Sequence, residues 1–336
     1  MKLLIVTQKV DRTDPILGFF RRWIEEFAKH CEHLTVIGQY VAERDFGPNV
    51  TVVSLRKEDG GARAVQVLRF WRRQWSLRKQ YDRVLVHMTP VWILLGAPLW
   101  LLLHKRMYLW YEIKRGSWKL SLALLFVRKV FTGTQRGIPR AHRKQVVVGH
   151  AVDTEKFSPD PRKCKSGLIV SIGRITRSKH FDVVLRAFAQ LPDSCRLFIA
   201  GGTITAKDRT ELASLRALMA KLRIAERVSI AWVPPDKIPA LLQRADLFLH
   251  ACIGGLDKVV LESMACGCPI VTSSALAEGI LPPICLVTEE SMAHHARELL
   301  ALSTEDRSAL VRDLRSRVER NHSLPHLIRR MVSAME

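Results

Sequence analysis

The sequence predicts an α/β protein made of two Rossmann-like domains, each a doubly wound parallel sheet. Short apolar runs alternate with segments of helical period along the chain, which is typical of a parallel sheet with crossover helices. The length of 336 residues suggests two domains, at about 150 residues for each. A stretch at 153–166 with two prolines and mixed charge is typical of the linker between them.

In the first half, six short apolar runs favour strands and four longer amphipathic segments favour helices. The expected strands are 2–6, 34–37, 50–53, 83–87, 107–110 and 129–132, and the expected helices are 19–29, 64–79, 92–103 and 118–127.

The second half repeats this alternation of strand and helix signals. The expected strands are 168–172, 196–200, 227–231, 246–250 and 269–272, and the expected helices are 181–190, 207–222, 237–243, 258–266 and 292–302. We therefore expect a domain at 1–152, a domain at 153–320, and a last helix at 321–336 that could cross back to the first domain.

Positive charge is concentrated in the first half. The chain has 53 Lys and Arg against 32 Asp and Glu, a net charge of +21. Residues 1–150 account for +16 and residues 151–336 for +5. This imbalance indicates an anionic partner for the first half: nucleic acid, an acidic membrane surface or a phosphate-bearing acceptor. The sequence contains no nucleic-acid-binding motif, so we do not expect nucleic acid.

The segment 64–79 combines tryptophans with arginines. Ala64, Leu68, Trp71 and Trp75 share one helical face, and five cations surround them. A basic helix with tryptophans suits a membrane interface. The alternative is a helix that packs its tryptophans on the sheet and turns its cations to water.

Cysteine usage and hydropathy favour the cytoplasm. The seven cysteines have no zinc-type pairing, and Cys266 and Cys268 lie in an apolar segment that suits buried, reduced thiols. We expect no secretion signal. The longest apolar run, 91–103, is too short for a bilayer, which needs about 20 residues.

Two segments of the second half carry candidate ligand contacts. Gly173 and Arg174 end an expected strand, and Lys179 precedes a helix. A close backbone approach, a forked guanidinium, an ammonium and a helix N-terminus together suit a diphosphate. The alternative is a loop with solvated charges.

The second segment is the Gly254-Gly255 loop and the helix after it. Asp257 can cap this helix, and Lys258 at its start favours a nearby anion, although it could equally be solvated. Glu262 lies on an otherwise apolar helix, where a carboxylate needs a partner. A ribose, with two hydroxyl donors, is one such partner.

In order along the chain, these residues resemble the retaining glycosyltransferases of family 4, which have the GT-B fold. The resemblance rests on Gly149-His-Ala-Val-Asp153, Phe157-Ser-Pro159, Ser171-Ile-Gly-Arg174 with Lys179, Leu197-Phe-Ile-Ala-Gly-Gly202, Ala245-Asp-Leu-Phe248 and Val260-Leu-Glu-Ser-Met-Ala-Cys-Gly267 with Pro269. It covers most of 145–275 and the first half only loosely.

The resemblance implies a nucleotide-sugar donor, bound in a cleft that the two domains face. Arg174 and Lys179 would neutralise its diphosphate, Glu262 would hold its ribose, and the Gly254-Gly255 backbone would lie against sugar or phosphate. The family normally requires no metal and no other cofactor, because the two basic residues take the metal's place.

The chain departs from the family pattern at two places. The first of the family's two signature glutamates falls at Gly254, which puts the choice of sugar, and turnover itself, in doubt; Asp257 and Lys258 could take over part of that contact. The family's histidine after the strand ending at 110 is also absent. His87 could substitute for it as a catalytic residue, or be structural. Gly18, before the first helix, would let its loop approach a ligand, or would simply start the helix.

The sequence as a whole favours an enzyme that transfers a sugar, with retention, to a glycan, lipid-linked or phosphorylated acceptor held by residues 1–150. Synthesis of glycans, cell-envelope polysaccharide or glycolipid would use such an enzyme. Its place would be the cytoplasm, or the inner face of the membrane as a peripheral protein. Two alternatives keep the fold: a sugar-nucleotide epimerase, and a non-catalytic protein that binds a nucleotide sugar or a membrane surface.

Overall fold

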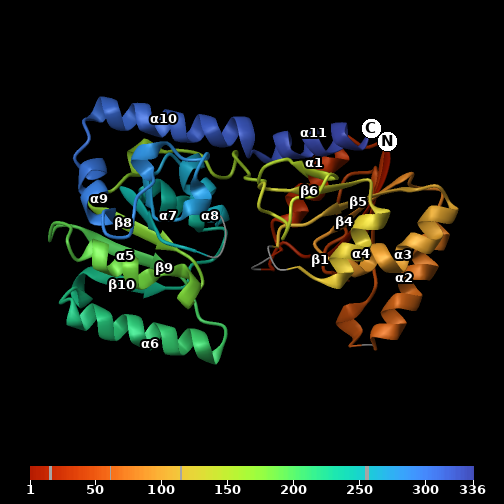
Figure 1. Ribbon diagram of the computed structural model, residues 1–336, viewed down its shortest axis with the longest axis horizontal. Helices are drawn as coiled ribbons and strands as arrows, with labels where there is room; N and C mark the ends of the chain where they lie inside the picture. Colours follow the sequence, from red (N-terminus) through yellow and green to blue (C-terminus); the bar gives the residue numbers. More distant parts are fainter. Residues whose placement is uncertain (15–16, 61, 114–115, 254–256) are drawn as a thin grey trace. The chain divides into compact units, whose positions relative to one another are not determined.

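The computed structural model describes residues 1–14, 17–60, 62–113, 116–253 and 257–336 (Figure 1). Contacts divide the chain into two compact units. Unit 1 comprises Met1–Ala151 together with Ser323–Glu336, and unit 2 comprises Val152–His322. The sequence predicts domain boundaries after residues 152 and 320.

Unit 1 is built on a seven-stranded, fully parallel sheet in the order β3-β2-β1-β4-β5-β6-β7. Its strands are β1 (Lys2–Val10), β2 (His33–Val41), β3 (Val50–Ser54), β4 (Arg83–His87), β5 (Arg106–Trp110), β6 (Lys129–Thr132) and β7 (Gln145–Val147). The first six agree with the expected strands to within a few residues, except that β1 and β2 are longer. The edge strand β7 was not expected.

Helices cover both faces of this sheet, as the alternation of strand residues shows. Leu3 and Ile5 of β1 belong to the core that contains α1 and α11, whereas Leu4 and Val6 belong to the core that contains α2, α3 and α4. The helices are α1 (Phe20–Ala28), α2 (Arg63–Leu77), α3 (Val91–Leu102), α4 (Trp118–Phe126) and α11 (Leu324–Met335).

The C-terminal helix α11 is part of unit 1. Its carbonyl groups accept hydrogen bonds from three strands of the sheet: from Arg83 Nε and the Tyr108 hydroxyl to the Met335 carbonyl, at 3.0 and 2.9 Å, and from Lys129 Nζ to the Ala334 carbonyl, at 2.7 Å. These bonds satisfy the carbonyls that a helix end leaves unpaired.

The tryptophans of α2 face outward. Trp71 and Trp75 are 46% and 53% exposed, whereas Phe70 and Gln74 are the buried residues of this helix. Of the two readings left open by the sequence, the one that packs the tryptophans on the sheet is therefore wrong. Within the described ranges, the structure contains no helix that is both apolar enough and long enough to span a membrane.

Unit 2 is built on a five-stranded parallel sheet in the order β10-β9-β8-β11-β12. Its strands are β8 (Leu168–Ile172), β9 (Arg196–Ala200), β10 (Val228–Ala231), β11 (Leu247–His250) and β12 (Ile270–Thr272). Its helices are α5 (Phe181–Phe188), α6 (Ala206–Lys221), α7 (Ile238–Arg244), α8 (Lys258–Ala265), α9 (Met292–Leu300) and α10 (Thr304–Asn321). The central strand β8 and its neighbour β11 lead into the loops that carry most of the candidate site residues.

Helix α10 was not expected from the sequence. It is capped by Ser303, whose hydroxyl accepts a hydrogen bond from the backbone N–H of Asp306, and it buries only Leu314 and Val318. Because so few of its eighteen residues are apolar, its helical period is weak in the sequence.

The cysteines are free, as expected, and Cys266 and Cys268 are buried. Burial raises the pKa of Cys266 to about 12, so its thiol is protonated and inert at neutral pH.

Candidate functional site

The loop between β8 and α5 approaches the end of β9 closely. The Gly173 N–H donates to the Ala200 carbonyl at 3.1 Å, and the Ile175 N–H donates to the Gly202 carbonyl at 3.0 Å. A side chain at Gly201 would overlap the Gly173 carbonyl oxygen, so the crossing requires a glycine. A short 3₁₀ turn, Arg177–Lys179, then turns the chain into α5.

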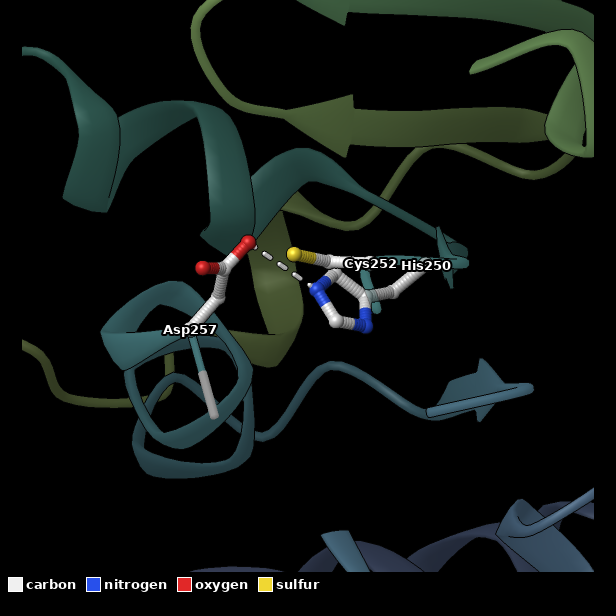
Figure 2. Close-up of side chains that lie close together, drawn as sticks. All are labelled: His250, Cys252 and Asp257. Carbon is white, nitrogen blue, oxygen red and sulfur yellow. Dashed lines mark hydrogen bonds and ion pairs between the residues drawn. The ribbon is translucent and has the colours of Figure 1, made fainter. Parts of the chain in front are cut away.

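Lys179 lies in a cluster of polar side chains from three segments of unit 2. Its Nζ is 2.5 Å from Oδ2 of Asp257 and 3.7 Å from Sγ of Cys252. The same Asp257 oxygen is 3.2 Å from Nε2 of His250, and Nδ1 of His250 is 2.8 Å from Oγ1 of Thr272. Figure 2 shows the imidazole, the thiol and the carboxylate converging. The polar side chains at and just after the ends of β11 and β12 therefore lie close to the ammonium of Lys179.

Asp257 is held as a carboxylate by this cluster. Burial alone would raise the pKa of Asp257, but the hydrogen bond from His250 and the charge of Lys179 lower it to about 2. Asp257 occupies the N-cap position of α8, yet its side chain makes no capping hydrogen bond. The expected side-chain cap was wrong because the carboxylate is committed to Lys179 and His250 instead.

Donor atoms of His250, Cys252 and Asp257 lie within 4.8 Å of one another, a grouping that could hold a metal ion. The ammonium of Lys179, however, already contacts two of the three side chains. A lysine thus supplies the positive charge that the cluster requires. The expectation that no metal takes part stays a prediction.

Arg174 has greater freedom than Lys179. Its side chain is 55% exposed, and its Nε lies 3.9 Å from Oδ2 of Asp208. That carboxylate already accepts hydrogen bonds from the backbone N–H groups of Ile204 and Thr205 at the start of α6. Hydrogen bonding to Ile204 is the main reason that the pKa of Asp208 is lowered. Arg174 can therefore turn to an anion without leaving a buried carboxylate unpaired.

Lys258 and Glu262 pair along the first turns of α8. Lys258 Nζ is 3.8 Å from Oε1 of Glu262, whose side chain is only 16% exposed. Burial raises the pKa of Glu262, and the charge of Lys258 opposes that shift. Additional hydrogen-bond donors would stabilise such a buried carboxylate. This agrees with the hypothesis that Glu262 accepts hydrogen bonds from the ribose hydroxyls.

The structure brings only some of the predicted residues together. Gly173, Lys179 and Asp257 form one contact group, because the Lys179 side chain packs over Gly173 and pairs with Asp257. Lys258 and Glu262 form a second pair. Gly254 and Gly255 lie outside the described residues, so the altered signature at position 254 stays a prediction.

The two candidate site residues in unit 1, His87 and Gly18, are both in close contact with neighbouring residues of the same unit. His87 is 2% exposed and packs against the ring of Phe20. Its Nδ1 shares a hydrogen bond of 3.2 Å with the Thr7 hydroxyl. Burial lowers its pKa to about 3, so the imidazole is neutral at physiological pH. A side chain at Gly18 would meet the carbonyl oxygens of Arg12 and Asp14, so the chain's own loop requires this glycine. Their functional roles stay predictions.

Sequence reasoning missed His250, Cys252 and Thr272. The only signal was position: His250 ends β11 and Thr272 ends β12, and the carboxyl ends of neighbouring parallel strands meet at one edge of a sheet.

Comparisons with known proteins find relatives of the segment that contains the site residues of unit 2. Residues 153–280 match the family model for glycosyl transferases group 1. A GDP-mannose-dependent alpha-(1-6)-phosphatidylinositol monomannoside mannosyltransferase of Mycolicibacterium smegmatis is 30% identical over 143 residues, which are 36% of this chain and 36% of that protein. A D-inositol 3-phosphate glycosyltransferase of Mycobacterium sp. (strain KMS) is 33% identical over 153 residues, 40% of this chain and 32% of that protein. The chain thus spans about a third of the length of these curated relatives.

The fold comparison extends over the whole chain. The crystal structure of HepE from Anabaena in complex with UDP has a TM-score of 0.75 at 15% identity, covering 100% of this chain and 99% of HepE. Its likeness concerns the fold, and it confirms the expected architecture of two Rossmann-like units. Residues 153–280 of this chain therefore match the group 1 glycosyltransferases, and the chain as a whole has the GT-B fold.

Proposed function

We propose that this chain transfers a sugar from a nucleotide diphosphate sugar to an acceptor. The observation that carries the proposal is the position of Lys179, Arg174 and Glu262, all within the segment that matches the glycosyltransferase family. Lys179 and Arg174 would stabilise the negative charge that develops on the departing diphosphate, and Glu262 would accept the ribose hydroxyls. The family resemblance supports retention of configuration and a reaction without a metal cofactor.

The acceptor side of the proposal concerns unit 1. Two curated relatives are named for a phosphatidylinositol mannoside and an inositol phosphate, and both names describe acceptors that carry phosphate. Residues 1–150 have the excess of cations that such an acceptor would need. We infer a lipid-linked, glycan or phosphorylated acceptor, used in the cytoplasm or at the inner face of its membrane. The free cysteines support a reducing compartment.

The reaction can be tested with the purified full chain. We expect hydrolysis or transfer from at least one of GDP-mannose, UDP-glucose and related donors, with activity retained in EDTA. Release of nucleoside diphosphate and free sugar, followed by anomer analysis, would report both turnover and stereochemistry. Tight nucleotide binding with no turnover for any donor would instead favour the non-catalytic binding protein. An epimerised nucleotide sugar as the product would favour the epimerase.

A further inference from the structure

Three helices of unit 1 form one continuous layer over a face of the sheet. Helix α3 contacts both α2 and α4, and their buried residues, among them Phe70, Trp100 and Leu120, share one core with the strands (Figure 1). The opposite sides of α2 and α4 are exposed, and α3 is exposed toward its C-terminal end. We call this outer surface of α2, α3 and α4 the α2–α4 face.

The α2–α4 face carries an unusual density of exposed apolar side chains. Among the described residues, sixteen large hydrophobic side chains are exposed, and nine of them lie on these three helices. A single exposed leucine needs no explanation, but a concentration of this kind marks a surface that is covered by something else. The nine are Val65, Leu68, Trp71, Trp75, Leu101, Leu102, Trp118, Leu122 and Leu125.

Cations accompany these apolar side chains. Helices α2, α3 and α4, with the two residues that follow α2, contain no acidic residue and seven cations: Arg63, Arg69, Arg72, Arg73, Arg78, Lys79 and Lys119. Helix α3 has no charged residue and α4 has one, Lys119, so the cations lie mainly along α2, beside two largely apolar helices. Such a distribution opposes a mixed-charge protein partner and complements an extended anionic surface.

Aromatic rings and cations are combined on the face as at a membrane interface. The Arg78 guanidinium lies 4.4 Å from the centre of the Trp75 ring, and Lys119 Nζ lies 5.7 Å from that of Trp118. The indole N–H of Trp71 donates to the Leu95 carbonyl at 2.8 Å, so its polar group is satisfied within the protein. Tryptophans with arginines beside them favour the headgroup level of a bilayer.

A basic pocket adjoins α2 on its side toward β3. Arg44, Arg56 and Arg73 line a cavity of about 360 Å³ together with Val52, Val53 and Ser54. None of these lining residues is acidic, although Arg56 also pairs with Asp59 at 3.1 Å. Three guanidinium groups in a cavity of this size suit a phosphate group, such as that of a lipid headgroup.

We propose that the α2–α4 face docks on the anionic leaflet of a bilayer, with its leucines and tryptophans in the interface and its cations at the lipid phosphates. The role of this docking surface rests on the proposed function, because it is the surface at which unit 1 would meet a lipid-linked acceptor. The docking itself is measurable without any turnover.

Vesicle co-sedimentation of the full chain tests the proposal. The vesicles are phosphatidylcholine alone or an equimolar mixture with phosphatidylglycerol. We expect strong binding to the mixture only, weakening with salt because a Debye length is about 8–10 Å at physiological ionic strength. The double variant Arg72→Glu/Arg73→Glu should bind at least ~10-fold more weakly, since each nearby cation contributes about fivefold.

Two further variants separate charge from apolar contact. Leu122→Ser/Leu125→Ser changes two exposed residues of α4 and should reduce the binding that survives at high salt. The matched control is Arg209→Glu/Arg216→Glu, which reverses the same number of exposed charges on α6 of unit 2. If docking is local to the α2–α4 face, this control should bind vesicles within about twofold of the unmodified chain.

Equal binding to both vesicle types, or an equal loss in the α6 control, would overturn the proposal. So would a dimer in solution that Leu122→Ser/Leu125→Ser dissociates, because the face would then belong to a second copy of the chain. The proposed function fails independently: a chain that binds vesicles as expected but uses no nucleotide sugar refutes the enzyme and leaves the docking face standing.

Discussion

The cations of unit 2 and those of the α2–α4 face are arranged in opposite ways. In unit 2, Lys179 is held by Asp257 and Lys258 by Glu262, each at a fixed place near the loops of the candidate site. On the α2–α4 face, cations far outnumber acids and lie beside exposed tryptophans. Paired, partly buried cations are oriented for one small anion, whereas uncompensated exposed cations attract an extended charged surface. The cations of unit 2 are therefore suited to binding a small anion, and those of the α2–α4 face to attraction by an extended anionic surface.

The largest expected effect concerns the paired cation Lys179. The variant Lys179→Ala should lower kcat/KM for the donor roughly 10- to 100-fold, because it removes a charge-assisted contact of about 1.5–3 kcal/mol. Arg174→Ala should have a smaller effect, since that side chain is more than half exposed. Steady-state kinetics at limiting donor measure both.

Lys237→Ala is the matched control for Lys179→Ala. Lys237 lies in the same unit, is 70% exposed and pairs with its neighbour Asp236 at 3.7 Å. It should change donor use by less than about twofold, as a surface ion pair contributes little. Full activity of Lys179→Ala would show that its ammonium serves only the internal cluster.

Asp257 tests how strongly the pairing stabilises unit 2. Its pKa is lowered from 3.8 to about 2, so the ionised carboxylate contributes stability that is complete above pH 4 and is lost as the pH falls toward 2. Asp257→Asn should lower the free energy of unfolding at pH 7 by about 2 kcal/mol. Denaturant titrations at pH 7, 4 and 3 would check this. The deficit should shrink with falling pH, and a pH-independent deficit would contradict the ion-pair account.

Glu262 should show the opposite pH dependence, with a smaller effect. Because burial raises its pKa above 4.5, the carboxylate destabilises the folded chain increasingly as the pH rises through its folded-state pKa. Glu262→Gln should therefore be at least as stable as the unmodified chain at pH 7, while binding UDP or GDP about tenfold more weakly. Thermal melts and calorimetric titrations measure the two quantities. An unstable variant whose folded fraction binds nucleotide normally would make Glu262 structural.

Much of the fold could be predicted because most elements have a clear hydrophobic period. The strand β8 is apolar except at Ser171, and α5 has a strongly amphipathic pattern, so both were located within about two residues. The edge strand β7 has three half-exposed or exposed residues and gives no such pattern. Helix α10 was missed for a related reason, since its surface is mostly polar and its stability depends on packing against α8.

The site was predictable only where its residues are close in sequence. Arg174 and Lys179 follow one strand, and Glu262 stands out as a carboxylate on an apolar helix. The contact of Lys179 with Asp257 joins residues 78 positions apart, so no local pattern reveals it. Burial of His87 likewise depends on the aromatic side chains of α1, which no motif places beside it.

The most direct test is a crystal structure of the full chain with UDP or GDP bound. We expect Lys179 Nζ to have exchanged Asp257 Oδ2, now 2.5 Å away, for a diphosphate oxygen, with the Glu262 carboxylate on the ribose hydroxyls. His250 should then remain as the partner of Asp257. A nucleotide bound away from α8, with Lys179 still paired to Asp257, would contradict the account.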